Sequence, residues 1–451
     1  MLRIAPLCLL AVVFIGNQST ADIVDDYSWS AHAKYQTQFN HYPENSFYRQ
    51  LIEDTAFDQL IDTRWKLSAK KNSVDFQIDY QLQAVDGDRV DFNQNSASLF
   101  SSNSGSNTHS VFSSLSYPTD KNRALNLMHV ISSDEDTVVL HRLDRLSVGY
   151  TNNKVAVRVG RQVVSWGNGL IYNPLDFFNP FDPTSIDKEY KTGDDMLYGQ
   201  YLFDSGSDLQ AVWVVRRQPE LSAGERRGDI DSSQQSLAIK YQTIIDDTDV
   251  SLVLSQHYED AIMGVGAVRS IGGALWRSDL MLSHTDIQKT ISFVTNLSYS
   301  WVWRKTNFNG VIEYFYNGFG VKKNKISVSD ITPNHLKDTT IDLLNRLQRG
   351  ELYGIGKHYL AASATVELSP LVIVTPVILF NVVDHSALLQ LTGHYDIAQN
   401  WQLVGSINFP LGPKDTEFGG MSTDIGLLSS ELANTTLATD ASLFLQLAFY
   451  F

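Results

Sequence analysis

The sequence predicts an all-β fold: a transmembrane antiparallel β-barrel of about eighteen strands, within a range of about 16 to 20. Apolar and polar residues alternate in many segments, most of them close to the ~9–11 residues that a tilted membrane strand needs. Tight turns alternate with long connections along the chain, and the last segment ends on Phe451. No run approaches the ~20 apolar residues of a membrane helix.

The N-terminus has the pattern of an export signal. Arg3 is followed by an apolar run over 7–15 and by Ser19-Thr20-Ala21, a small-x-small cleavage site. We expect residues 1–21 to be a cleaved signal peptide and 22–451 to form a single barrel domain. The one cysteine, Cys8, lies in the signal, so disulfides do not hold the expected mature chain together.

Composition excludes some classes of protein. The chain has 451 residues, 43% of them hydrophobic, with 50 Asp+Glu against 35 Lys+Arg and a net charge of −15. The apolar fraction is too high for a disordered chain, and the charge is wrong for a nucleic-acid binder. We therefore expect no nucleic-acid partner.

The clearest alternation predicts a hairpin around Lys71-Asn72. Folding 61–69 onto 73–85 places Trp65 opposite Ile78 and Leu67 opposite Phe76 on the apolar face. The polar face then brings Arg64 opposite Asp79. One register satisfies both faces.

The same pattern predicts eighteen strands, and the connections between them differ in length. The strands are expected at 27–39, 61–69, 73–85, 143–150, 155–159, 197–203, 209–215, 237–243, 250–254, 263–268, 274–282, 293–303, 308–316, 360–366, 371–380, 387–395, 401–409 and 441–451. Every second connection is tight, and the long ones are 41–58, 86–140, 164–194, 217–235, 318–358 and 410–440. Short periplasmic turns and long extracellular loops are typical of barrels in the outer membrane of Gram-negative bacteria.

The C-terminal strand predicts partners. Alternating apolar residues ending on Phe451 match the signal by which the outer-membrane assembly machinery recognises such chains. Outer-membrane lipid and lipopolysaccharide are the expected surroundings.

The polar face of the strands is expected to line a lumen that eighteen strands leave wide enough for water. Its predicted charges are Arg64, Asp79, Arg145, Arg158 and Arg161. Arg145 and Arg158 are expected to be diagonal neighbours across an Asn152-Asn153 turn. Either they pair with wall carboxylates, or they form a cationic strip that guides an anion.

The connection 164–194 is expected to fold into the lumen, because Pro and Gly prevent a regular strand and its aromatics need burial. We expect a constriction in which the aromatics lie against the wall and Asn168, Asn173 and Asp176 face the water path. Arg158 and Arg161 are the expected partners of Asp176 or Asp182. The alternative is a rigid lid with no ligand role. The predicted constriction residues are Trp166, Asn168, Tyr172, Asn173, Asp176, Phe177 and Phe178.

Another long connection predicts a helix over about 333–349. Thr332 suits the N-cap, Pro333 the first helical position and Gly350 the C-terminal cap. We expect this short amphipathic helix at the extracellular mouth.

Three segments carry a resemblance to a known family: 141–150, beginning His-Arg-Leu-Asp-Arg; 160–176, beginning Gly-Arg-Gln-Val-Val-Ser-Trp-Gly-Asn-Gly; and 191–197, beginning Lys-Thr-Gly-Asp-Asp. They resemble a poorly characterised family of proteobacterial outer-membrane barrels in the porin-like superfamily, whose members are described as domains of unknown function. The plan is also similar to that of alginate-export porins, without their dense arginine lining. The resemblance implies fold and location rather than substrate.

These observations predict a passive channel for small polar or amphipathic solutes. The alternatives are a non-conducting barrel that serves as a structural or partner-binding platform, and a channel for hydrophobic compounds. An outer-membrane hydrolase ranks last, because neither Gly-x-Ser-x-Gly nor His-Glu-x-x-His occurs. We expect no enzyme activity, no cofactor and no metal.

Overall fold

The computed structural model describes residues 26–50, 52–92, 119–218, 228–331, 338–423 and 435–451. The predicted signal peptide lies outside these residues. Within them, eighteen antiparallel strands close into a barrel, as the sequence predicts. They are β1 (Asp26–His41), β2 (Thr55–Lys71), β3 (Val74–Gly87), β5 (Thr137–Thr151), β6 (Val155–Gln162), β7 (Asp194–Leu202), β8 (Asp208–Val214), β9 (Ser236–Ile245), β10 (Thr248–His257), β11 (Asp260–Ile271), β12 (Ala274–His284), β13 (Lys289–Trp303), β14 (Thr306–Tyr316), β15 (His358–Ser369), β16 (Val372–Asn381), β17 (Ser386–Ala398), β18 (Trp401–Leu411) and β21 (Ala441–Tyr450).

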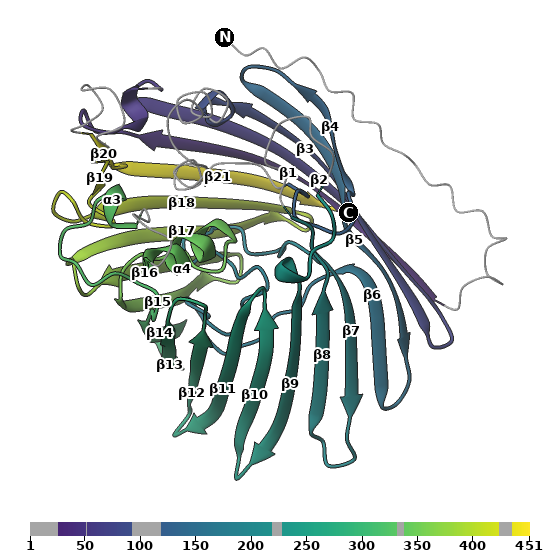
Figure 1. Ribbon diagram of the computed structural model, residues 1–451. Helices are drawn as coiled ribbons and strands as arrows, with labels where there is room; N and C mark the ends of the chain where they lie inside the picture. Colours follow the sequence, from purple (N-terminus) through teal and green to yellow (C-terminus); the bar gives the residue numbers. More distant parts are fainter. Residues whose placement is uncertain (1–25, 51, 93–118, 219–227, 332–337, 424–434) are drawn as a thin grey trace.

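The strands follow chain order around the barrel (Figure 1), and the last strand pairs with the first. β21 runs antiparallel to β1, with Tyr35 opposite Leu447. Two backbone hydrogen bonds between Ala31 and Phe451, of 2.7 and 2.9 Å, complete the ladder. Closure leaves neither β1 nor β21 as an exposed edge, as a sheet in lipid requires.

The tight turns have backbone conformations that only certain residues adopt readily. In the β9–β10 turn, Asp246 and Asp247 have φ of +46° and +63°, and Gly272 and Gly273 of the β11–β12 turn have +56° and +88°. Two successive positive φ angles define the type I′ turn, whose twist matches that of a two-stranded ribbon. The long connections lie at the other end of the barrel, as expected.

The first predicted hairpin forms with a different register. β2 and β3 pair with Leu67 opposite Ile78 and Lys66 opposite Asp79, so Arg64 lies opposite Gln81 rather than Asp79. The predicted pairing was wrong by two residues. Both faces remain as predicted, because a shift of two residues returns each side chain to the same face.

A β-bulge in β5 changes which residues face inward. Asp79 pairs with Arg145 and Tyr80 with Leu143, so Asp144 is the extra residue on β5. Asp144 and Arg145 are therefore both buried inside, although they are adjacent in sequence. The hairpin that follows places Arg158 opposite Gly149. Arg145 and Arg158 are not the diagonal neighbours that the sequence suggested.

Short elements lie between the barrel strands. β4 (Met128–Ser133) pairs with the part of β5 at the long-loop end of the barrel, beyond the residues that pair with β6. The others are η1 (Tyr48–Gln50), η3 (Ser232–Gln234), α3 (Val328–Ile331), α4 (Thr340–Gln348), β19 (Met421–Ser422) and β20 (Thr436–Leu437).

The helix α4 occupies the C-terminal part of the range predicted for a helix. Its N-cap is Thr339, while the predicted N-cap Thr332 and Pro333 lie outside the described residues. Gly350 follows the helix with φ +68°. In Figure 1, α4 lies at the end of the barrel that carries the long connections.

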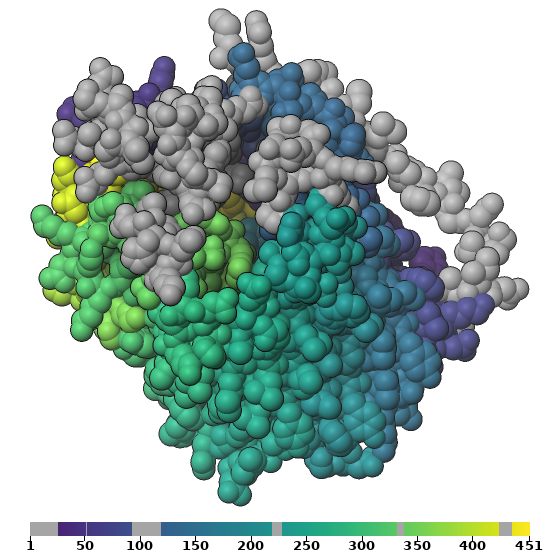
Figure 2. Space-filling model, in the orientation of Figure 1, coloured from purple at the N-terminus to yellow at the C-terminus, as the bar shows by residue number. Residues whose placement is uncertain are grey.

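The outer wall is apolar over much of its surface. Side chains such as Leu254, at 60% exposure, and Ile312, at 66%, point outward and away from the interior. Figure 2 shows this outer face over β8–β12 as a continuous wall. Among the described residues, no helix combines the length and the apolar character needed to cross a membrane.

Candidate functional site: a loop folded across the barrel

Residues 163–193, which we call the crossing loop, connect β6 to β7 through the interior. Trp166, Tyr172, Phe177 and Phe178 are only 2–7% exposed. The apolar cluster that contains them also contains inward-facing strand residues such as Val253 and Phe315. The loop aromatics therefore lie against the inner face of the wall.

Two wall carboxylates hold the first part of the crossing loop. Asp279 of β12 accepts hydrogen bonds from the backbone N and side-chain Nδ2 of Asn168, at 2.5 and 2.6 Å. Glu313 of β14 accepts the backbone N–H groups of Leu170, Ile171 and Tyr172, at 2.8, 3.1 and 2.6 Å. Charged acceptors make these bonds stronger than neutral ones.

Ring contacts extend this attachment. Tyr172 stacks on Phe315 of β14, with ring centroids 4.9 Å apart, and contacts Tyr359 of β15 at 5.0 Å. On the neighbouring wall, Trp166 donates its indole N–H to Gln210 of β8 at 2.8 Å.

The last part of the crossing loop is held by strands on the far side of the barrel. Lys34 of β1 contacts Asp187 and Glu189 at 2.5 and 2.7 Å. Gln390 of β17 donates to the carbonyl oxygen of Thr184 at 2.9 Å. Since β8 and β17 are nine places apart in an eighteen-stranded barrel, the loop reaches opposite walls.

The predicted partners of Asp176 were wrong. Asp176 pairs with Lys191 at the end of the same loop, with Nζ 2.5 and 2.7 Å from its two carboxylate oxygens. Burial raises the pKa of Asp176 to about 6, although Lys191 opposes the shift. Asp176 is only 6% exposed, so it does not face a water path as expected. Asn173 donates to the carbonyl oxygen of Trp166 at 3.1 Å, which closes the first turn of the loop.

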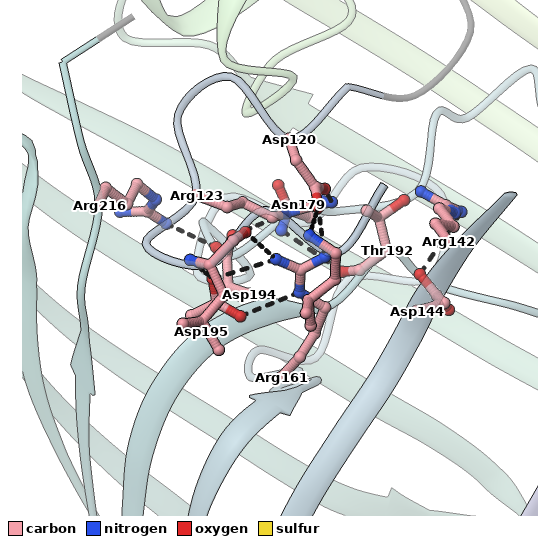
Figure 3. A network of polar contacts seen from close by, with 12 residues as sticks. Asp120, Arg123, Arg142, Asp144, Arg161, Asn179, Thr192, Asp194, Asp195 and Arg216 are labelled. Carbon is pink, nitrogen blue, oxygen red and sulfur yellow. Dashed lines mark hydrogen bonds and ion pairs between the residues drawn. The ribbon is translucent and has the colours of Figure 1, made fainter. Parts of the chain in front are cut away.

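Arg161 forms part of a different, fully buried network (Figure 3). It contacts Asp120 and Asp195 at 2.7 and 2.9 Å. Arg123 bridges Asp120 and Asp194, and Arg216 binds Asp194 at 2.7 Å. The three arginines and three aspartates balance in charge, so this network fixes the 120–127 segment to β6 and β7 rather than leaving cations free.

Arg64 and Arg145 converge on the bulge residue Asp144, at 2.6 and 2.7 Å. Asp79, the other predicted lumen charge here, pairs in register with Arg145. Sequence analysis missed Asp144 because simple alternation cannot place it and Arg145 on one face. For Arg145, the structure supports the interpretation that it pairs with a wall carboxylate.

Arg158 lies apart from these networks, in a polar recess. Its contact with Asp75 is 3.5 Å, and its side chain is 40% exposed. The recess, of about 300 Å³, is also lined by Gln162, Gln200 and Trp166. Its position places it between the crossing loop and the short-turn end of β6–β8.

One arrangement that sequence analysis did not find joins Ser236, His257 and Glu351. Ser236 Oγ lies 2.8 Å from His257 Nδ1, and His257 Nε2 lies 3.0 Å from Glu351. All three are buried, and Arg216 Nη1 donates to Ser236 Oγ at 2.8 Å. A hydroxyl held in this way is not open to a substrate. Among the described residues, no cluster of His, Cys, Asp and Glu could hold a metal ion.

The fold defined by these strands also occurs in solved structures. OccAB4 of Acinetobacter baumannii is similar with a TM-score of 0.50 and 8% identity, over 95% of this chain and 99% of that chain. OccAB2 of the same species has a TM-score of 0.50 and 10% identity, over 95% and 98%. At these identities the likeness shows the fold alone.

No family model matches the chain, and no curated protein matches it. The resemblance to the uncharacterised outer-membrane family therefore stays a prediction.

Proposed function

We propose that this chain is a porin-like channel of the outer membrane, through which small polar or amphipathic solutes pass passively. The crossing loop sets the narrowest part of the path. One observation carries the proposal: a single loop is bound to opposite walls, by Asp279 and Glu313 on one side and by Lys34 on the other. An apolar outer wall around an ionic interior supports a place in lipid.

The interior chemistry supports a polar solute. Arg64 Nε, Arg142 Nη1 and Arg158 Nε are buried nitrogens without a hydrogen-bond acceptor among the described residues. A guanidinium presents five donors and loses free energy when a donor stays unpaired. Of the three side chains, only that of Arg158 is open, at 40% exposure in the polar recess, and a solute that brings oxygen acceptors would pair with its guanidinium there.

The test is a deletion of Gly167–Pro180 with conductance measured in planar bilayers. Removing the segment held by Asp279 and Glu313 should raise conductance severalfold, while the barrel keeps its heat-modifiable, β-rich form. If conductance and solute uptake stay unchanged, the loop is an external lid and Trp166, Asn168, Tyr172, Asn173, Asp176, Phe177 and Phe178 do not line a constriction.

A second candidate is a closed barrel that serves as a structural or partner-binding platform. The apolar cluster around Tyr172 also contains Phe47, from the β1–β2 connection, and Phe319 and Leu343, both from the β14–β15 connection. Loops packed together in this way support a closed mouth. Electrical silence that persists after the deletion would favour the platform over the channel.

A further inference from the structure

An apolar groove crosses the outer face of β9–β13 next to their extracellular ends. Its volume is about 730 Å³. Leu237 and Leu254 on its wall are 55% and 60% exposed, and the small Ala261 lies between Gln256 and His284 on neighbouring strands. The lining also includes Ile239, Met263, Leu282 and Ile291.

Lysines lie above and beside this groove on the same rim. Lys289 faces His284 across β12 and β13 and lines the groove itself. Lys322 lies in the connection between β14 and β15, and Lys357 directly precedes β15. Among the described residues, none of these lysines has a carboxylate within ion-pair distance.

These cations have no carboxylate partner among the described residues, in a chain with a net charge of −15, although Lys357 Nζ donates to the carbonyl oxygen of Gly318 at 2.6 Å. Burial and then Lys322 lower the pKa of Lys357, which indicates that the two ammonium groups repel each other. Their neighbours Lys323 and Lys325 instead pair with Asp330 and Asp415.

Two exposed carboxylates share the rim. Glu259 lies in the β10–β11 turn and Asp286 in the β12–β13 turn. The positive part of the rim therefore runs from Lys289 toward β15, on one side of the groove.

We propose that this face binds lipid A, with acyl chains in the groove of β9–β13 and phosphates on Lys289, Lys322 and Lys357. The inference rests on the outer-membrane location proposed above, since the long-loop end then lies in the outer leaflet. Burial of acyl methylenes supplies binding free energy, and ammonium groups bind phosphate as point charges.

The distance between the lysines favours lipid A over lipids that carry a single phosphate. Phe293 of β13 pairs with Tyr316 of β14, which pairs with His358 of β15, so Lys289 and Lys357 are separated by two strand spacings as well as along the strands. One phosphate cannot contact both, whereas lipid A carries two phosphates on a disaccharide. A second copy of the chain would bring a second set of lysines against the first.

The experiment measures lipid binding to the refolded full barrel by native mass spectrometry, with bis-phosphorylated lipid A as the probe. Replacing all three lysines (Lys289→Ala, Lys322→Ala, Lys357→Ala) should weaken binding by about tenfold or more. The matched control removes three exposed cations at the short-turn end (Lys70→Ala, Lys154→Ala, Arg269→Ala), and should bind as the wild type does.

Two further arms test phosphate and groove separately. Dephosphorylated lipid A should bind more weakly to the wild type, and Ala261→Trp, which fills the groove, should weaken lipid A while the barrel stays heat-modifiable. The proposal would be overturned if dephosphorylated lipid A bound the wild type as tightly as bis-phosphorylated lipid A, or if the two triple variants weakened binding equally. It would also be overturned if phosphatidylglycerol bound more tightly than lipid A, or if the chain formed a dimer through this face. Conductance is not measured, so this result is independent of the channel proposal.

Discussion

Glu313 is the residue on which the crossing loop depends most directly, because one carboxylate accepts three consecutive backbone N–H groups. Glu313→Ala leaves these donors buried without an acceptor, at a cost of about 1–3 kcal/mol for each. We expect hydrogen exchange at the amides of Leu170–Tyr172 to become about a hundredfold faster or more. The control is Glu367→Gln, which replaces an exposed carboxylate near a short turn and should leave these exchange rates unchanged. Equal protection in the Glu313 variant would show that ring packing alone holds the loop.

Glu417 should give the connections at the long-loop end of the barrel a pH dependence. Its carboxylate accepts from the Ile355 amide at 3.0 Å, from Tyr359 and from Asn381, and burial raises its pKa to about 7 from 4.5. Because the folded pKa is raised, this anchor is at full strength below about pH 4.5 and weakens as pH rises to about 7. Between pH 5 and 8 the opening free energy at Ile355 should fall by about 2–3 kcal/mol.

Hydrogen exchange at the Ile355 amide, corrected for the intrinsic rate, measures this effect. Glu417→Gln cannot ionise and should remove the pH dependence. A slope that persists in this variant would assign the titration to another group, such as Asp384, whose charge acts on Glu417.

Burial of the loop aromatics followed from the sequence, while their polar partners did not. Five exposed aromatics in one loop would each forfeit about 1.5–3 kcal/mol, and this argument needs no structure. Arg161, in contrast, pairs with Asp120 and Asp195, which lie on separate elements. Only the closed barrel brings those carboxylates together, so the sequence suggested nearer and incorrect partners.

Among the strands, the positions and most faces were predictable, whereas the strand ends and the β2–β3 register were not. For example, β2 begins at Thr55 and β5 at Thr137, six residues before the predicted starts in both cases. A shift of two residues keeps every side chain on its face, so alternation cannot distinguish Leu67–Ile78 from Leu67–Phe76. The bulge at Asp144 was not predicted either, because it reverses the alternation of inward and outward side chains within one strand.

Cysteine cross-linking tests the register of β2 and β3. Ser68 lies opposite Gln77, whereas the register predicted from sequence places it opposite Asp75. Directly opposite residues have Cβ atoms about 4.5–5.5 Å apart, and diagonal ones lie beyond the reach of a disulfide. Since the sequence after residue 21 has no cysteine, Ser68→Cys with Gln77→Cys should oxidise far more completely than Ser68→Cys with Asp75→Cys. The reverse order would favour the register that the sequence suggested.

At the scale of the whole molecule, the sequence was sufficient to predict a closed barrel of about eighteen strands, within a range of 16 to 20. Two independent patterns agreed: alternation within segments, and the contrast between tight and long connections. β4 was not predicted, because it lies within a long connection and pairs only with part of β5. β4 can pair with β5 only beyond the point where β6 ends, and that point is set by how the barrel strands pair.

The C-terminal strand is expected to have two roles: it closes the barrel by pairing with β1, and its terminal phenylalanine is recognised during assembly. A chain ending at Asp440 lacks β21 and leaves β1 and β18 as open edges, so we expect no heat-modifiable form. Phe451→Ala keeps the backbone hydrogen bonds to Ala31, and the Phe451 ring is 46% exposed. This variant should therefore fold in detergent as the wild type does, yet assemble more slowly in vesicles that contain the outer-membrane assembly machinery. Gel mobility before and after heating measures both. If Phe451→Ala failed to fold in detergent alone, the ring would stabilise the closed barrel itself, and recognition by the machinery would not be needed to explain the terminal phenylalanine.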